Sequence, residues 1–128
     1  MELRKLQKIV VNALEDIKGK DIEVLNTTQL TSLFDRLVIA TGDSNRQVKA
    51  LARNVQEKVR EAGAEVISVE GEDTGEWVLV DLGDIVVHVM QPSVRQYYNL
   101  EELWQATPAQ RKKAVAALEP TAGLNAEA

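Results

Sequence analysis

A single histidine, His88, lies in an otherwise aliphatic stretch, GEWVLVDLGDIVVHVMQ, which spans residues 75–91 and also contains Asp81. A histidine, a carboxylate and a serine hydroxyl can together form a nucleophilic triad, and Ser68 is the nearest upstream serine. Such a serine is usually presented on a sharp G-x-S-x-G turn, and the sequence contains no such motif. The residue types permit a triad, but the sequence does not predict one.

A metal site is not predicted either. The chain has no cysteine and one histidine, which excludes thiolate and multiple-imidazole ligand sets. Asp81 and Asp84 flank the turn of the hairpin, where we expect solvated side chains rather than two ligands of one ion. We therefore predict no catalytic residues, no metal ligands and no cofactor.

The turn Gly42-Asp43-Ser44 is the third place where chemistry could occur. Small residues before a helix can bind an anion, and nucleotidyltransferases use a Gly-Ser turn after a first strand together with two acidic residues on the next strand. Here the segment 65–68 reads Glu-Val-Ile-Ser and lacks the second acid. Ser44 is followed three residues later by Gln47, which is a capping-box spacing. A helix cap is the simpler interpretation.

The hairpin itself has an unusual mixture of residue types. Side chains alternate along a strand, so an even-numbered connection such as Leu82-Gly83 gives one wholly aliphatic face. The opposite face would then carry aromatic, apolar and polar groups together: Trp77, Leu79, Asp81, Val86, His88 and Met90. A three-residue connection with a bulge at Gly83 would mix the two sets. We prefer the first register because it separates apolar from mixed residues.

Two interpretations of the mixed face remain open. Aromatic and flexible apolar residues beside polar groups are typical of protein interfaces, so Trp77 could be exposed to a partner. Alternatively, a C-terminal helix that includes Trp104 could cover the face, in which case Trp77 and His88 would belong to the core.

Hydrophobic periodicity predicts the framework that positions these residues. The pattern indicates helices at 3–17, 48–62 and from Pro92 through 104, and strands at 21–26, 34–41, 65–70 and within the hairpin 75–91. The strand–helix–strand succession suggests a crossover between parallel strands. We predict an α/β fold: a single domain with a mixed, roughly five-stranded sheet and flanking helices.

Composition limits the function classes. The chain of 128 residues has a net charge of -5 and no apolar stretch near the ~20 residues that cross a bilayer. We expect a cytoplasmic protein without membrane contact. Because nucleic-acid binding depends on clustered Lys and Arg, and only 111–113 cluster along the sequence, we expect little direct nucleic-acid contact and a basic protein as partner.

The C-terminal segment differs from the rest. Thr107-Pro108 has the cap and first-turn residues of a last helix, and the composition becomes small and polar beyond Pro120. We divide the chain into a domain of residues 1–106 and a segment 107–128, with a helix and a disordered tail.

Three stretches in this order resemble the ribosomal silencing factor family RsfS, also called Iojap-like proteins. They are DRLVIATGDSNRQVKALA at 35–52, VEGEDTGEWVLVDLGDIVVHVM at 69–90 and RQYYNLEELW at 95–104. The likeness extends from the first helix to Trp104. It implies a nucleotidyltransferase-like fold without known catalysis.

The resemblance also implies a partner and a mechanism. Members of this family bind the large ribosomal subunit through large-subunit ribosomal protein fourteen, which blocks joining of the small subunit and lowers translation. A binder needs an exposed patch, and the resemblance therefore favours the following partner-binding residues: Trp77, Leu79, Asp81, His88, Met90, Arg95 and Tyr98. We expect Leu100, Leu103 and Trp104 to pack inside the protein.

Other functions stay open at this stage. The chain could be a minimal nucleotidyltransferase with Gly42, Ser44 and Asp81 near its site, or a factor for large-subunit assembly, as organellar relatives of the family are. A homodimer in the free state is also compatible with the sequence.

Overall fold

The computed structural model describes residues 1–105, without the side chains of Trp104 and Gln105. Its elements are α1 (Leu3–Asp16), β1 (Lys20–Asn26), β2 (Arg36–Thr41), α2 (Asn45–Glu61), β3 (Ser68–Glu70), β4 (Trp77–Asp81), β5 (Ile85–Met90), α3 (Pro92–Tyr98) and α4 (Leu100–Gln105). The prediction of an α/β fold with a mixed five-stranded sheet is confirmed. The predictions for residues 107–128 and for the packing of Trp104 lie outside this description.

The strand order is β1-β2-β5-β4-β3, and only the pair β2 and β5 is parallel among neighbouring strands. The segment predicted as a strand at 65–70 is a strand only at Ser68–Glu70 and lies at the edge, antiparallel to β4. The chain therefore does cross over through α2 to a strand that runs parallel to β2. However, β5 and β4 lie between the two, so they are not neighbours.

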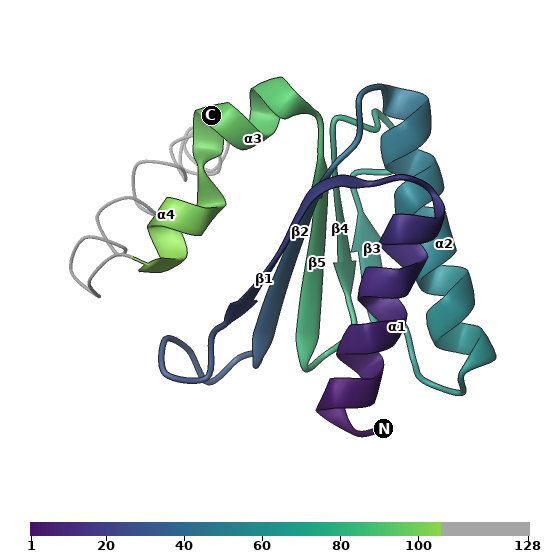
Figure 1. Cartoon of the computed structure of the whole chain (residues 1–128), viewed down its shortest axis with the longest axis vertical. Helices are drawn as coiled ribbons and strands as arrows, with labels where there is room; N and C mark the ends of the chain where they lie inside the picture. Colours follow the sequence, from purple (N-terminus) through teal and green to yellow (C-terminus); the bar gives the residue numbers. More distant parts are fainter. Residues whose placement is uncertain (106–128) are drawn as a thin grey trace, which may run out of the picture.

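One face of the sheet is covered by α1 and α2, which lie side by side (Figure 1). Both helices bury a stripe of apolar residues at spacings of three and four, such as Leu6, Val10 and Leu14 in α1. The same face of the hairpin contributes Val78, Val80, Leu82, Ile85, Val87 and Val89 to this core. The predicted aliphatic face of the hairpin is confirmed.

The turn of the hairpin differs from the prediction. Val80 pairs with Val87 and Asp81 with Val86, so the two residues at the tip are Gly83 and Asp84 rather than Leu82 and Gly83. Gly83 has φ of +91°, which glycine adopts without strain. The register has shifted by two residues relative to the prediction, and a shift of two leaves every side chain on the expected face.

The other face of the sheet is covered in part by α3 and α4. Leu100 and Leu103 of α4 pack over Leu37, Ile39 and Met90 in a second, smaller core cluster. The helix predicted after Pro92 is broken, because Asn99 adopts a left-handed conformation with φ of 48°. Asparagine tolerates this conformation better than most residues, and the break turns α4 back over the sheet (Figure 1).

Within residues 1–105, no helix is both long and apolar enough to span a membrane.

Candidate functional site

An aromatic patch lies where the mixed face of the hairpin meets α3. We define it as Trp77, His88, Tyr97 and Tyr98. The ring centroids of Trp77 and Tyr98 are 4.8 Å apart with planes tilted by 47°, and Tyr97 meets Tyr98 edge-on at 4.9 Å. Such geometries are favourable for aromatic pairs. Trp77 is half-buried and Tyr97 is 80% exposed, so the patch has a fixed base and an accessible rim.

His88 fixes the orientation of Trp77. The indole Nε1–H donates a hydrogen bond of 2.8 Å to Nδ1 of His88. Because an indole nitrogen can only donate, Nδ1 must be unprotonated and the neutral ring carries its proton on Nε2. Burial lowers the pKa of His88 to about 4. Around neutral pH this histidine is therefore a neutral acceptor that supports Trp77, and it does not offer a positive charge to a partner.

Leu79 and Asp81 lie on β4 beside the patch, and both are partly exposed. Leu79 is directly opposite His88 on β5. Asp81 accepts a hydrogen bond of 2.8 Å from the backbone N–H of Gly83 through Oδ1. One carboxylate oxygen thus stabilises the hairpin turn.

Met90 does not belong to the accessible surface. It is 0% exposed and packs with Leu37, Ile39, Leu100 and Leu103. The expectation that Met90 forms part of an exposed face is wrong, because the C-terminal helix covers this end of the hairpin. The two interpretations of the mixed face are both partly right: α4 covers Met90, whereas Trp77 stays partly exposed.

Arg95, which the family resemblance favours as a partner-binding residue, is instead largely buried. Its side chain is 11% exposed, and its guanidinium joins three elements. Nη1 donates to the Asp21 carbonyl at 2.5 Å and to Thr41 Oγ1 at 2.8 Å, while Nε and Nη2 donate to Glu101 at 3.1 and 2.9 Å. Nη2 also reaches Glu23 at 3.4 Å. All five N–H groups have a partner, so Arg95 holds α3 and α4 against β1 and β2.

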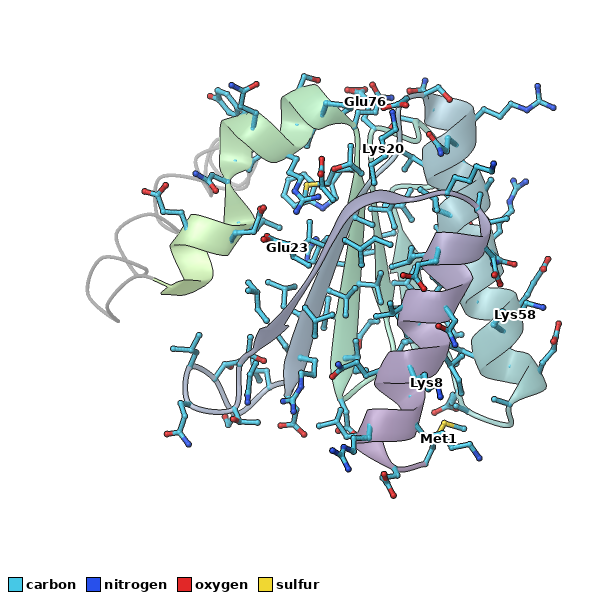
Figure 2. All side chains as sticks on the ribbon, in the orientation of Figure 1. Met1, Lys8, Lys20, Glu23, Lys58 and Glu76 are labelled. Carbon is cyan, nitrogen blue, oxygen red and sulfur yellow. The ribbon has the colours of Figure 1, made fainter. Side chains whose placement is uncertain are left out.

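Two carboxyl groups share this arginine. The pKa of Glu23 is raised, first by its hydrogen bond to the Glu101 carboxyl and then by burial. For Glu101, burial is the largest single influence and opposes ionisation, but the hydrogen bonds from Arg95, the backbone and Glu23 together with the charge of Arg95 outweigh it, and the pKa is lowered. Glu101 is therefore the ionised partner of Arg95, and Glu23, which projects from β1 toward α3 and α4, keeps its proton to higher pH (Figure 2).

The turn Gly42-Asp43-Ser44 behaves as a helix cap. Ser44 Oγ accepts a hydrogen bond of 3.1 Å from the Gln47 N–H, as predicted. The Gln47 side chain returns to the N–H of Asp43 at 2.7 Å, one residue earlier than a capping box requires. A hollow of about 370 Å³ beside the turn is lined by Lys20, Thr41, Asp43, Arg95 and Glu101, among others. Its cations are already engaged, because Lys20 pairs with Asp43 at 2.5 Å and Arg95 has no unused donor.

The described part of the chain contains no set of side chains that could bind a metal ion. Across residues 1–105, no group of three or more His, Asp or Glu side chains is arranged to hold an ion. Asp81 points to the hairpin turn and Asp43 to Lys20, so the acidic residues near the two candidate sites serve separate structural contacts.

Tyr97 is the patch residue that the sequence reasoning missed. Tyr97 is adjacent to Tyr98 and follows Arg95 by two positions. Residues two positions apart in a helix point in nearly opposite directions, so Tyr97 is on the side of α3 away from Arg95. The adjacent pair of tyrosines after a helix-starting proline was the available signal.

Comparisons with known proteins give a consistent result. Residues 1–127 match the family model described as ribosomal silencing factor during starvation. A Chromobacterium violaceum protein named ribosomal silencing factor RsfS is 62% identical over 104 residues, which cover 81% of this chain and 85% of that protein. A Bacillus subtilis protein of the same name is 41% identical over 108 residues, which cover 84% and 92%. A crystal structure of a Chromobacterium violaceum protein has a TM-score of 0.81 at 60% identity, covering 84% of this chain and 89% of that one.

Proposed function

Because the chain belongs to the ribosomal silencing factor family, we propose that it binds the large ribosomal subunit and lowers translation by blocking the joining of the small subunit. The contact proposed is with large-subunit ribosomal protein fourteen, as the family resemblance implies. The block is steric: the protein occupies a surface that the small subunit needs. No bond is made or broken in this mechanism.

The aromatic patch is the observation that carries the proposal. Exposed aromatic groups on a rigid base are typical anchors of protein interfaces, and a partly covered anchor loses little conformational entropy on binding. The surrounding charges are acidic, with Glu70, Glu76 and Asp81 on or beside β3 and β4. A basic ribosomal protein complements such a surface.

An enzymatic role has weaker support. A minimal nucleotidyltransferase would use the Gly42–Ser44 turn to bind phosphates, but the turn caps α2 and the cations beside it are paired within the protein. Specific binding of a nucleoside triphosphate with Mg²⁺ at micromolar concentration would revive this alternative.

Two substitutions in the patch test the proposal. Tyr97→Ala removes a side chain that is 80% exposed, so we expect weaker co-sedimentation with purified large subunits and an unchanged unfolding midpoint. Trp77→Ala should weaken binding by about 2 kcal/mol or more, as is usual for a central anchor, and it should also lower stability because Trp77 packs on the second core cluster. Leu33→Ala is the matched control, since Leu33 is 81% exposed in the loop between β1 and β2.

The outcome for Tyr97 separates binding from folding. If Tyr97→Ala and Leu33→Ala bind large subunits equally well, the patch is not the interface. Binding to precursor rather than mature subunits would instead indicate an assembly factor.

If the block is steric, inhibition of subunit joining should depend only on how many large subunits are occupied. Light scattering of subunit association can test this. Asp81→Asn keeps the oxygen that accepts from Gly83 and removes only the charge. We expect it to bind more weakly, with a smaller salt dependence, and still to block joining completely at saturation. A variant that saturates large subunits without preventing association would show that occupancy is not the mechanism.

A further inference from the structure

The charges of this acidic protein are strongly separated in space. Helices α1 and α2 together contain eight Lys and Arg and four Asp and Glu, a net charge of +4. The whole chain has a net charge of -5, so the remainder has -9. The helical layer is therefore basic, whereas the sheet and its loops are acidic. Lys8 and Lys58 label the outer side of this layer in Figure 2.

Four of these cations form a row along α2, which we call the α2 ridge: Arg46, Lys49, Arg53 and Arg60. At 3.6 residues per turn they fall within a sector of about 60°, and the row is about 21 Å long. It lies opposite the buried stripe that includes Val48, Val55 and Val59. Arg46, Arg53 and Arg60 are exposed, and Lys49 is partly exposed. Sequence inspection missed the row because its members are three, four and seven positions apart.

The ridge is not neutralised within the protein. Glu57 is four positions after Arg53, a spacing that favours an ion pair, yet among residues 1–105 the only ion pair made by α1 or α2 is Lys58–Glu61 at 3.7 Å. Lys58 is outside the ridge. Four unpaired cations at this spacing favour an extended polyanion over a single carboxylate.

The edges of the ridge define how a polyanion would lie. The acidic loop 71–76 borders it on the β4 side, where a Cβ at Gly75 would come within 2.9 Å of Lys49 Cε and Gln56 donates to Glu72. A strand of phosphates is therefore favoured along the axis of α2 and disfavoured across it. Since α2 covers one face of the sheet and the aromatic patch is on the other, the two surfaces do not compete.

We propose that the α2 ridge binds the phosphate backbone of RNA in the large ribosomal subunit. The inference rests on the proposed function, because that function places the chain on a particle built largely of RNA. It revises the expectation of little direct nucleic-acid contact. The ridge adds a salt-sensitive contact that is independent of the protein partner and needs no base recognition.

The test compares two double variants that remove the same charge. Arg46→Gln/Arg53→Gln removes two of the four cations of the ridge, and Lys5→Gln/Lys8→Gln removes two exposed cations of α1. Each phosphate contact contributes roughly 0.7–0.9 to the steepness of the plot of log K against log salt concentration. The ridge variant lacks two such contacts, so its slope should be shallower by about 1.5. Its affinity near 0.1 M salt should be lower by roughly tenfold or more. The α1 variant should stay within about twofold of wild type. Arg46→Lys/Arg53→Lys should keep most of the affinity, because phosphate contact needs charge more than a fork.

Affinity is measured by titration of labelled protein with intact large subunits and, separately, with protein-free large-subunit RNA. Selective loss by the ridge variant on both targets supports the proposal. Equal losses by the two double variants, or an unchanged salt slope, overturn it. So does binding of wild type to polyglutamate rather than to RNA, which would assign the ridge to an acidic protein.

The RNA arm separates this inference from the proposed function. If wild type binds protein-free RNA through the ridge but not intact subunits, the proposed function fails, and of the inference only the binding of RNA by the ridge is retained. If wild type binds intact subunits and Tyr97→Ala weakens this binding, while the ridge variant binds normally, the proposed function is supported and the inference about the ridge fails. Unfolding midpoints of all variants establish that each is folded.

Discussion

Replacing Arg95 with methionine removes all five N–H donors of the guanidinium and keeps an unbranched apolar stem of similar length. The change leaves Glu101 without its counter-charge and disconnects α3 from Asp21 and Thr41. Breaking a well-buried ion pair by removing one partner costs about 3–5 kcal/mol. Because Glu101 is 23% exposed and Glu23 is 50% exposed, solvent screens part of this, and we expect a loss of about 2–3 kcal/mol in the free energy of unfolding.

Lys20→Met is the matched control for this experiment. The Lys20–Asp43 pair is shorter, at 2.5 Å against 2.9 Å for Arg95–Glu101, but its side chains are 58% and 52% exposed. An exposed pair contributes at most about 1 kcal/mol, so the buried and more extensively hydrogen-bonded Arg95 should cost clearly more to replace than Lys20. Urea denaturation at neutral pH measures both, and amide hydrogen exchange should show faster exchange in α3 and α4 for Arg95→Met only.

The opposite result is equally informative. If Arg95→Met costs no more stability than Lys20→Met but binds large subunits more weakly, Arg95 faces the partner, as the family resemblance implies. The structural assignment of Arg95 as the residue that holds α3 and α4 in place would then be wrong.

Three other predictions concern His88, Ser44 and Met90. The pKa of His88 is about 4 in the folded protein and near 6.5 in the unfolded chain, so between these pH values the unfolded state binds more protons. The free energy of unfolding should therefore fall by on the order of 2 kcal/mol as the pH drops from 6.5 to 4.5. Urea unfolding at a series of pH values measures this, and His88→Gln should lack this part of the pH dependence. Ser44→Ala should cost about 1 kcal/mol, measured by urea unfolding, with subunit binding unchanged; a binding loss at equal stability would place the turn in the interface. Met90→Ala should cost about 2–5 kcal/mol by the same measurement, and a near-neutral effect would contradict its burial under α4.

The parts of the fold that could be predicted depend on residues that are close to one another along the chain. Alternation of Val78 and Val80 with partly polar neighbours defines the faces of the hairpin without knowledge of the turn, because only the parity of the register matters. The cap at Ser44 depends on a residue three positions away. Both signals survive in the sequence because the interacting residues are close along the chain.

The parts that were not predictable depend on distant residues. Arg95 contacts Asp21 and Thr41, which are 74 and 54 positions away, and nothing near Arg95 in the sequence indicates its burial. The break at Asn99 separates two segments that each favour a helix. Hydrophobic periodicity therefore predicts one continuous helix and does not indicate the break. The burial of Met90 follows from that break, because only a helix that turns back can cover this end of β5.

The strand order has a consequence for synthesis of the chain. The central strand β5 is the last of the five to be made, and its parallel partner β2 precedes it by 49 positions, since Arg36 pairs with Ile85. Until residue 90 has left the ribosome, β2 has one unpaired edge, and the side chains of Leu100 and Leu103 that cover Leu37 and Ile39 emerge later still. The sheet cannot be completed strand by strand from the N-terminus; it closes in one late step of long-range pairing, which is slow. A nascent chain that stops before β5 would expose an aliphatic strand edge, the feature that promotes aggregation.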